Sequence, residues 1–202
     1  MTELNAELSD HIIETEFGEA IHHPLLIALP YLPMMTDTLN HQIEYKQKAV
    51  ADALSRSDYQ NYLWLHERPY RLDAFLDICD ELSDEKYWQL LADIWIDSES
   101  IYINGDRWVE ALSQRSDESR AMMMSDEERL ELSELPETIT VYRGCKRDIN
   151  EQGLSWTLSK SKAEWFAKRW GNDDGDVITR QIDKSEIVAL LNGRGEREII
   201  LL

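Results

Sequence analysis

The sequence predicts an α+β protein in which a helical N-terminal part is followed by a β-rich C-terminal part. Before Pro136, apolar residues recur at the three- and four-residue spacing of amphipathic α-helices. After Pro136, the pattern changes to short runs of β-branched and aliphatic residues separated by turn residues. The charge balance changes at the same place, because residues 1–136 carry 29 of the 40 acidic residues but 10 of the 21 basic ones.

The helical part shows its pattern best after Ser83, a typical N-cap residue. The apolar residues that follow lie on one face of a helix, and they are Tyr87, Leu90, Leu91, Ile94 and Trp95. Similar patterns predict helices at about 37–54, 70–82, 106–112 and 126–132.

A domain boundary is predicted at Leu135-Pro136, with an acidic helical region at 1–136 and a β-rich region at 137–202. The alternative is one continuous domain that includes the preceding helices. Strands are predicted at 138–143, 154–158, 176–182, 187–191 and 196–202.

One helix interrupts these predicted strands. Ser161 and Glu164 have the spacing of a capping box, and Gly171 can supply the C-terminal cap. The apolar stripe of this helix consists of Ala163, Phe166, Ala167 and Trp170.

The net charge of −19 argues against direct nucleic-acid binding, because an acidic surface repels phosphates. It favours either an ordinary solubilising surface or a basic partner. The longest apolar stretch, 24–35, is interrupted by Pro30 and Pro33 and is too short to span a membrane. The acidic N-terminus has no signal-peptide pattern, which indicates a cytoplasmic protein, with delivery into a host cell left open.

Several common chemistries find no support in the sequence. Cys79 and Cys145 form no CxxC pair, which excludes a disulfide scaffold and a cysteine zinc site. The phosphate-loop, dinucleotide-fingerprint, HExxH and GxSxG motifs are all missing. All five histidines precede residue 67, and His22-His23 before Pro24 is typical of a surface turn, so no metal is expected.

The β-rich part carries polar residues at strand positions that could share one cleft. Arg143 ends a predicted strand and is followed by Gly144, which permits close approach of a backbone or ligand. Ser155 and Thr157 lie two residues apart, so their hydroxyls share a strand face, while Trp156 points to the other.

Glu196 and Glu198 likewise share a face at the start of the last predicted strand, after the turn Asn192-Gly193-Arg194-Gly195. If the three strands are neighbours, the arginine, the hydroxyls and the carboxylates face one cleft. Taken singly, these residues favour a purely structural explanation: an ion pair for Arg143, an exposed strand face for Ser155 and Thr157, and a charged sheet edge for the two glutamates.

The order Tyr142-Arg143-Gly144, Ser155-Trp156-Thr157, Glu196-Arg197-Glu198 resembles the arginine, serine, glutamate signature of mono-ADP-ribosyltransferases of the cholera-toxin-like and clostridial-toxin-like class. The resemblance covers about 138–202. The stretch GLSWTLSKSKAEWFAKRW is also similar to small bacterial and phage members of this group. It implies a helical N-terminal part followed by an ADP-ribosyltransferase-like β-sandwich that binds NAD between its sheets.

The resemblance also implies a role for each motif residue. Glu198 would stabilise the oxocarbenium-like transition state through the ribose 2′-hydroxyl, and Ser155 would hold Glu198 in place. Arg143 would clamp a phosphate of NAD, the substrate, with Gly144 and Thr157 beside it.

The remaining implied roles concern nicotinamide and the acceptor. Trp156 or Tyr142 would pack near nicotinamide. Glu196 would orient a protein arginine and take its proton, because an arginine acceptor is protonated at neutral pH. The implied reaction transfers ADP-ribose from NAD to an exposed arginine of a basic protein, with release of nicotinamide and without a metal.

Two other functions remain open at this stage. One is hydrolysis of NAD without a protein acceptor, and the other is a catalytically silent acidic module that binds a basic partner. The sequence also leaves open the identity of the acceptor and whether the outcome is toxic or regulatory.

Overall fold

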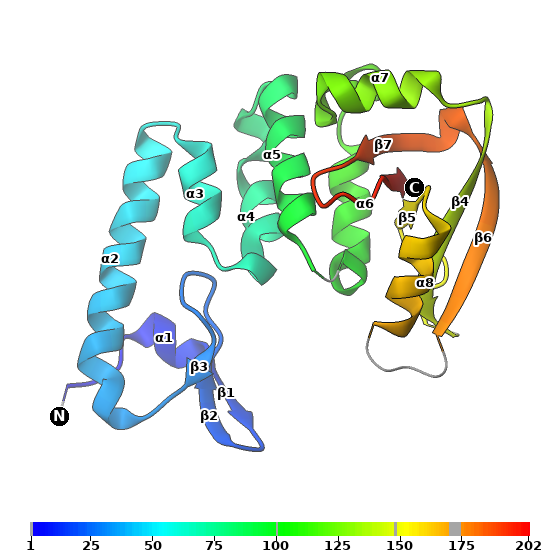
Figure 1. The fold of residues 1–202 in the computed structure, drawn as a ribbon. Coiled ribbons are helices and arrows are strands. Elements are labelled where there is room, and N and C mark those ends of the chain that lie inside the picture. The colour runs from blue at the N-terminus through cyan, green and yellow to red at the C-terminus, as the bar shows by residue number, and fades with distance from the viewer. Residues whose placement is uncertain (1, 100, 148, 170–174) are drawn as a thin grey trace. The chain divides into compact units, whose positions relative to one another are not determined.

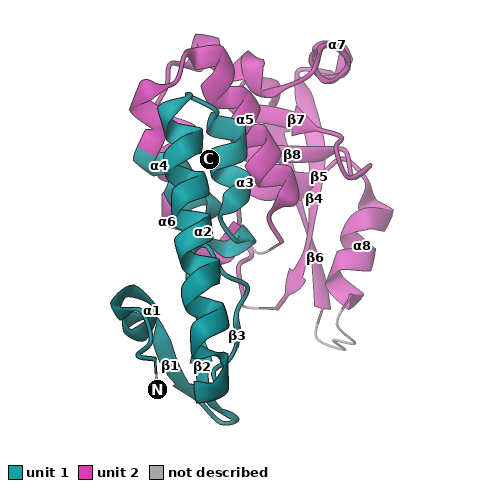
Figure 2. Cartoon of the chain, turned by 90° about the vertical axis from the view of Figure 1, so that its left-hand side faces the viewer, with its two compact units in different colours: residues 1–77 teal, residues 78–202 magenta. Residues whose placement is uncertain are grey.

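The computed structural model describes residues 2–99, 101–147, 149–169 and 175–202. The chain is an α+β protein that divides into two compact units, Met1–Asp77 and Ile78–Leu202 (Figures 1 and 2). This division precedes the boundary predicted at 136/137, because the helices between 84 and 134 belong to the same unit as the C-terminal sheet. In the described ranges, no helix combines the length and apolarity of a membrane span.

The first unit combines a small sheet with helices. Its elements are α1 (Ala6–Asp10), β1 (Ile12–Thr15), β2 (Gly18–Ile21), β3 (Leu29–Pro30), α2 (Thr36–Ser55), α3 (Tyr59–Leu65) and most of α4 (Arg71–Ile78). The strands form an antiparallel sheet in the order β1-β2-β3. Its apolar cluster consists of Leu8, Ile21, Leu25, Leu26, Leu39 and Ile43.

The predicted helical N-terminal part therefore also contains three short strands between residues 12 and 30, which the sequence analysis did not predict. The strands there span two to four residues, which is too short for alternation to emerge from the sequence pattern. The helix predicted at 37–54 is confirmed as α2, and the one predicted at 70–82 ends earlier, with α4 followed by a 3₁₀ turn at Cys79–Glu81.

The second unit begins with helices that match the predicted ones. They are α5 (Asp84–Asp97), α6 (Gly105–Ser113) and α7 (Asp126–Glu134), with 3₁₀ segments at Ile101–Asn104 and Asp117–Met123. The predicted cap of α5 is confirmed, because the Ser83 side chain accepts a hydrogen bond from the Lys86 amide.

Large aromatic residues hold these helices together. The buried Tyr87 donates its hydroxyl proton to the Ala111 carbonyl at 2.6 Å. Trp95 and Trp108 meet edge to face, with ring centroids 4.8 Å apart. These contacts join α5 to α6.

The C-terminal strands form one five-stranded antiparallel sheet in the order β6-β4-β5-β8-β7. Their bounds are β4 (Thr138–Lys146), β5 (Ser155–Thr157), β6 (Gly175–Asp183), β7 (Ile187–Leu191) and β8 (Glu198–Leu201). All five predicted strands are confirmed, although β8 starts two residues later than expected. Within the described part of this unit, the strands belong to this single sheet.

The helix between β5 and β6 is α8 (Lys160–Lys168), and it lies against β4 and β6 (Figure 1). Its N-cap is Ser159, whose hydroxyl accepts from the Lys162 amide, so the prediction that Ser161 caps it was wrong. Ser159 is the N-cap because α8 begins at Lys160, which places Ser161 inside the helix. The predicted C-cap Gly171 and the stripe residue Trp170 lie outside the described residues.

Gly144 permits the close contact between α8 and β4. A Cβ atom at this position would overlap the Ala163 carbonyl oxygen and would lie 2.7 Å from the Ala167 amide nitrogen. The sequence prediction that a backbone or ligand approaches Gly144 is confirmed for a backbone, because α8 occupies that space.

We expect Gly144→Ala to lower the free energy of unfolding by about 1–3 kcal/mol, because the new methyl group must push α8 away from the sheet. Urea unfolding followed by circular dichroism measures the loss. Gly105→Ala is the matched control, since nothing lies within 4 Å of a Cβ atom there. Equal unfolding midpoints for the two variants would contradict the close packing of α8.

Candidate functional site

Three adjacent strands bring the sequence motifs together. Tyr142 of β4 is paired with Thr157 of β5, and Thr157 is paired with Glu198 of β8. The strand order therefore places the Arg143, Ser155 and Glu198 motifs side by side in the middle of the sheet. The sequence analysis predicted a shared cleft only if these three strands are neighbours, and they are.

Arg143 lies where β4 and β5 separate. Their pairing is confined to Tyr142 and Thr157, and beyond it the Arg143 guanidinium donates to two backbone carbonyls. Nε donates to the Asn150 oxygen at 2.9 Å, and Nη1 donates to the Ser155 oxygen. Burial lowers the pKa of Arg143, and the nearby Cys145 and Glu198 oppose this shift. Arg143 thus fastens the 150–155 segment beside β4.

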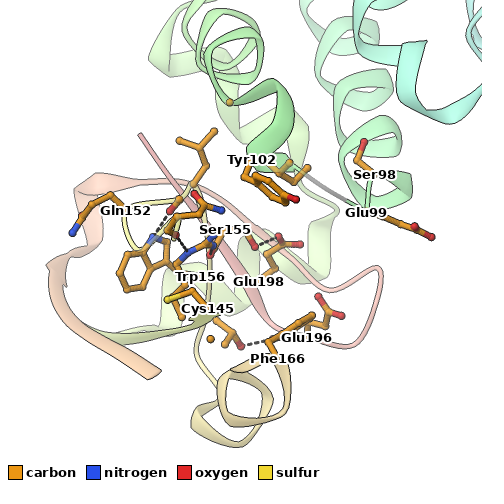
Figure 3. Close-up of a pocket in the computed structure, with 18 of the residues that line it drawn as sticks. Ser98, Glu99, Tyr102, Cys145, Gln152, Ser155, Trp156, Phe166, Glu196 and Glu198 are labelled. Carbon is orange, nitrogen blue, oxygen red and sulfur yellow. Dashed lines mark hydrogen bonds between the residues drawn. The ribbon is translucent and has the colours of Figure 1, made fainter. Parts of the chain in front are cut away.

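Ser155 and Glu198 form the centre of the site. The Ser155 hydroxyl donates a hydrogen bond to Oε1 of Glu198 (Figure 3). Glu198 is buried, with 3% of its surface exposed. A buried carboxylate requires hydrogen-bond donors, because burial removes its water. The serine supplies one of them from the neighbouring strand.

Glu196 lies in the turn before β8, so the prediction that both glutamates start the strand was wrong. Arg197 between them has a φ of 47°, which breaks the extended conformation. The Thr157 hydroxyl donates to the Glu196 carbonyl at 2.6 Å and fixes this turn. Burial raises the pKa of Glu196, while Arg194 opposes the shift.

Arg194 joins the two glutamates, and the sequence analysis did not assign it a role. Its Nη2 donates to Oε2 of Glu198 at 2.9 Å, and its Nε lies 3.4 Å from Oε2 of Glu196. Its Nη1 donates to the carbonyl oxygen of Ser98 at 3.0 Å, and Ser98 is the C-cap residue of α5. The only sequence signal was an arginine between two glycines directly before the glutamate pair.

Trp156 and Tyr142, the aromatic residues expected near nicotinamide, lie on the neighbouring strands β5 and β4. Trp156 is 3% exposed, and its indole N–H donates to the Gly153 carbonyl at 2.8 Å. Tyr142 is partly buried and lines the cavity. Trp156 is therefore held by the segment that Arg143 fastens.

These residues line a cavity of about 870 Å³, which is within the range of small-molecule and cofactor sites. All the predicted site residues line it: Tyr142, Arg143, Gly144, Ser155, Trp156, Thr157, Glu196 and Glu198. Another part of the wall comes from the segment after α5, including Tyr102, and from Trp165, Phe166 and Arg169 at α8. The sequence analysis missed these residues, because only the tertiary structure brings the segment after α5 and the side chains of α8 to the motif residues.

The cavity offers both signs of charge. Arg143, Lys146, Arg169 and Arg194 line it together with Glu99, Asp106, Glu196 and Glu198. The lining thus carries equal numbers of basic and acidic residues, whereas the whole chain has 21 basic and 40 acidic ones. Among the described side chains, no group of three or more His, Cys, Asp or Glu is placed to hold a metal ion.

Comparisons of the chain with protein-family models, curated proteins and solved structures find no match.

The raised pKa of Glu196 predicts a pH-dependent stability. The folded state then holds a proton that the unfolded state has lost, once the pH exceeds the ordinary carboxyl pKa of about 4.3. The contribution of Glu196 to the free energy of unfolding is fully present below that pH. It is lost as the pH rises through the pKa that Glu196 has in the folded state. We expect Glu196→Gln to gain stability relative to the natural protein over this rise.

Urea unfolding midpoints measured between about pH 4 and 7 test this expectation, since they bracket the ordinary value. If the natural protein instead becomes more stable than Glu196→Gln as the pH rises, the ion pair between Glu196 and Arg194 outweighs the effect of burial.

Proposed function

We propose that the protein is a mono-ADP-ribosyltransferase that transfers ADP-ribose from NAD to a protein arginine and releases nicotinamide. The observation that carries the proposal is the hydrogen bond from Ser155 to the buried Glu198, at a cavity that Arg143 and Glu196 also line. These are the residues that the motif resemblance selected from the sequence, and their proximity supports it.

NAD as the substrate agrees with the chemistry of the cavity. Its pyrophosphate requires cationic donors, and Arg143 and Arg169 supply guanidinium groups at the lining. Its nicotinamide and adenine rings require apolar surfaces, and Tyr102, Tyr142 and Phe166 are available. We assign Arg143 a double role, because it also holds the 150–155 segment through two carbonyls.

Glu198 is assigned to the ribose of NAD. When the bond between ribose and nicotinamide breaks, positive charge develops on the sugar, and a nearby carboxylate stabilises it. A carboxylate held in advance needs no reorganisation during the reaction. Ser155 provides part of this preorganisation by holding Oε1, while Oε2 must exchange Nη2 of Arg194 for the ribose hydroxyl.

Glu196 is assigned to the acceptor. An acceptor arginine must be oriented and must lose a proton as it attacks the ribose carbon. The raised pKa of Glu196 makes it a better proton acceptor than an ordinary surface glutamate. The ion pair with Arg194 also supports this assignment, because it places a guanidinium beside the two carboxylates.

The ADP-ribosyltransferase-like β-sandwich stays a prediction, because the described strands of this unit form one five-stranded sheet. The pairing of β4 and β5 is reduced to one residue pair, which opens the sheet beside Arg143. We propose that the dinucleotide binds at this opening, where Arg143 lines the cavity. The acidic surface of residues 1–136 suits a basic acceptor protein.

We expect Glu198→Gln to lose both ADP-ribose transfer and NAD hydrolysis by about two to four powers of ten, because the amide cannot stabilise positive charge on the ribose. The measurement is nicotinamide release from NAD, with and without a small guanidine such as agmatine. NAD binding by the variant, followed by calorimetry, is the control for folding. Near-normal release by this variant would refute the catalytic assignment of Glu198.

Glu196→Gln separates the two carboxylates. We expect this variant to lose transfer to agmatine while it retains substantial nicotinamide release to water, because only the acceptor step requires Glu196. Both activities are measured on the same preparation. Equal loss of both would count against an arginine acceptor, and full retention of both would leave Glu196 without a role in the reaction.

A further inference from the structure

Arg194 places a guanidinium at the point where the proposed reaction needs its acceptor. The group lies beside Glu198 through Nη2 and beside Glu196 through Nε. These are the two carboxylates assigned to the ribose and to the acceptor. The side chain is 32% exposed, so an attached group could extend from the cavity into solvent.

The position of Arg194 is held by its surroundings. Nη1 donates to the Ser98 carbonyl at the end of α5, on another part of the cavity wall. The preceding Gly193 lies so close to α5 that a Cβ atom there would be 2.7 Å from Ile96 Cδ1. Gly195, with a φ of 64°, then turns the chain back toward the glutamates. The turn therefore directs Arg194 into the site.

A neighbouring arginine on the same turn provides a contrast. Arg197 pairs with Glu131 of α7 through Nη2 at 2.6 Å and does not line the cavity described here. The two arginines share the exposed turn, but Arg194 is the one that contacts both glutamates. Position relative to the carboxylates, rather than exposure, distinguishes them.

We propose that Arg194 is an internal acceptor and that the protein modifies itself there with ADP-ribose. This inference rests on the function proposed above. In the step, the bond between the ribose C1′ and nicotinamide breaks, and the electron pair leaves with neutral nicotinamide. Nη2 of Arg194 forms the new bond to C1′, and the proton that it loses passes to Glu196 and then to water.

The step requires one rearrangement. Oε2 of Glu198 must exchange Nη2 of Arg194 for the ribose hydroxyl, while Oε1 stays with Ser155. Arg194 can keep its contact with Glu196 during this exchange, because that contact uses Nε. Nη2 then remains close to the ribose but no longer occupies Oε2 of Glu198, which binds the ribose hydroxyl. Once modified, Arg194 can no longer occupy the site as a free guanidinium.

The direct test is incubation of the full chain with NAD alone, followed by proteolysis and mass spectrometry. We expect one ADP-ribose group on the peptide that contains Arg194. Arg194→Lys should lose this adduct, because lysine has a single terminal nitrogen and lacks the guanidinium that contacts Glu196 and Glu198 through different atoms. Arg197→Lys is the matched control and should keep it. An adduct on another arginine, or an adduct on the same peptide in Arg194→Lys, overturns the inference.

A mixing experiment tests whether the acceptor is internal. The natural protein is incubated with NAD and an equal amount of Glu198→Gln that carries a mass label. The adduct should form on the natural chain, at a rate per molecule that does not change with protein concentration. Adduct on the labelled chain, or a rate that rises with concentration, overturns modification within one molecule.

Nicotinamide release separates this inference from the proposed function. Release without an adduct on Arg194 overturns the internal acceptor and leaves the transferase proposal intact. No release from NAD, with agmatine present or absent, overturns both.

Discussion

The burial of Glu198 is the constraint on which the rest of the site depends. A carboxylate removed from water is stable in a protein only when donors and opposite charge replace its hydration. Ser155 supplies a hydroxyl from β5, and Arg194 supplies a guanidinium from the turn before β8. The pairing of β5 with β8 places Ser155 near Glu198, and the turn before β8 places Arg194 there, so the site depends on the sheet.

The opening between β4 and β5 gives the site its cavity. After the pair Tyr142 and Thr157, the two strands are linked by the Arg143 side chain instead of by further strand pairing. A substitution of Arg143 therefore affects both the charge of the cavity and the segment that closes one side of it. Gly144 completes the arrangement, because it lets α8 lie directly against the sheet and bring Phe166 to the cavity.

Local sequence patterns were sufficient where one element carries the whole signal. The Ser83 cap and the apolar face after it predicted α5, and the runs after Pro136 predicted five strands. They were insufficient for β1 to β3, whose alternation is too short to read, and for the cap of α8, where Ser159 and Ser161 are equally suitable residue types. The unit boundary also lies elsewhere, because α5 to α7 share a unit with the sheet.

The sequence by itself determined the α+β class and the residues that could form a polar site, because helix and strand periodicity and residue chemistry are local properties. Tertiary structure decided that Arg143, Ser155 and Glu198 lie on adjacent strands, and that Arg194 and the segment after α5 join them. It also placed Glu196 in a turn instead of on β8. These outcomes depend on strand order and on packing between residues far apart in the chain, and no local pattern encodes either.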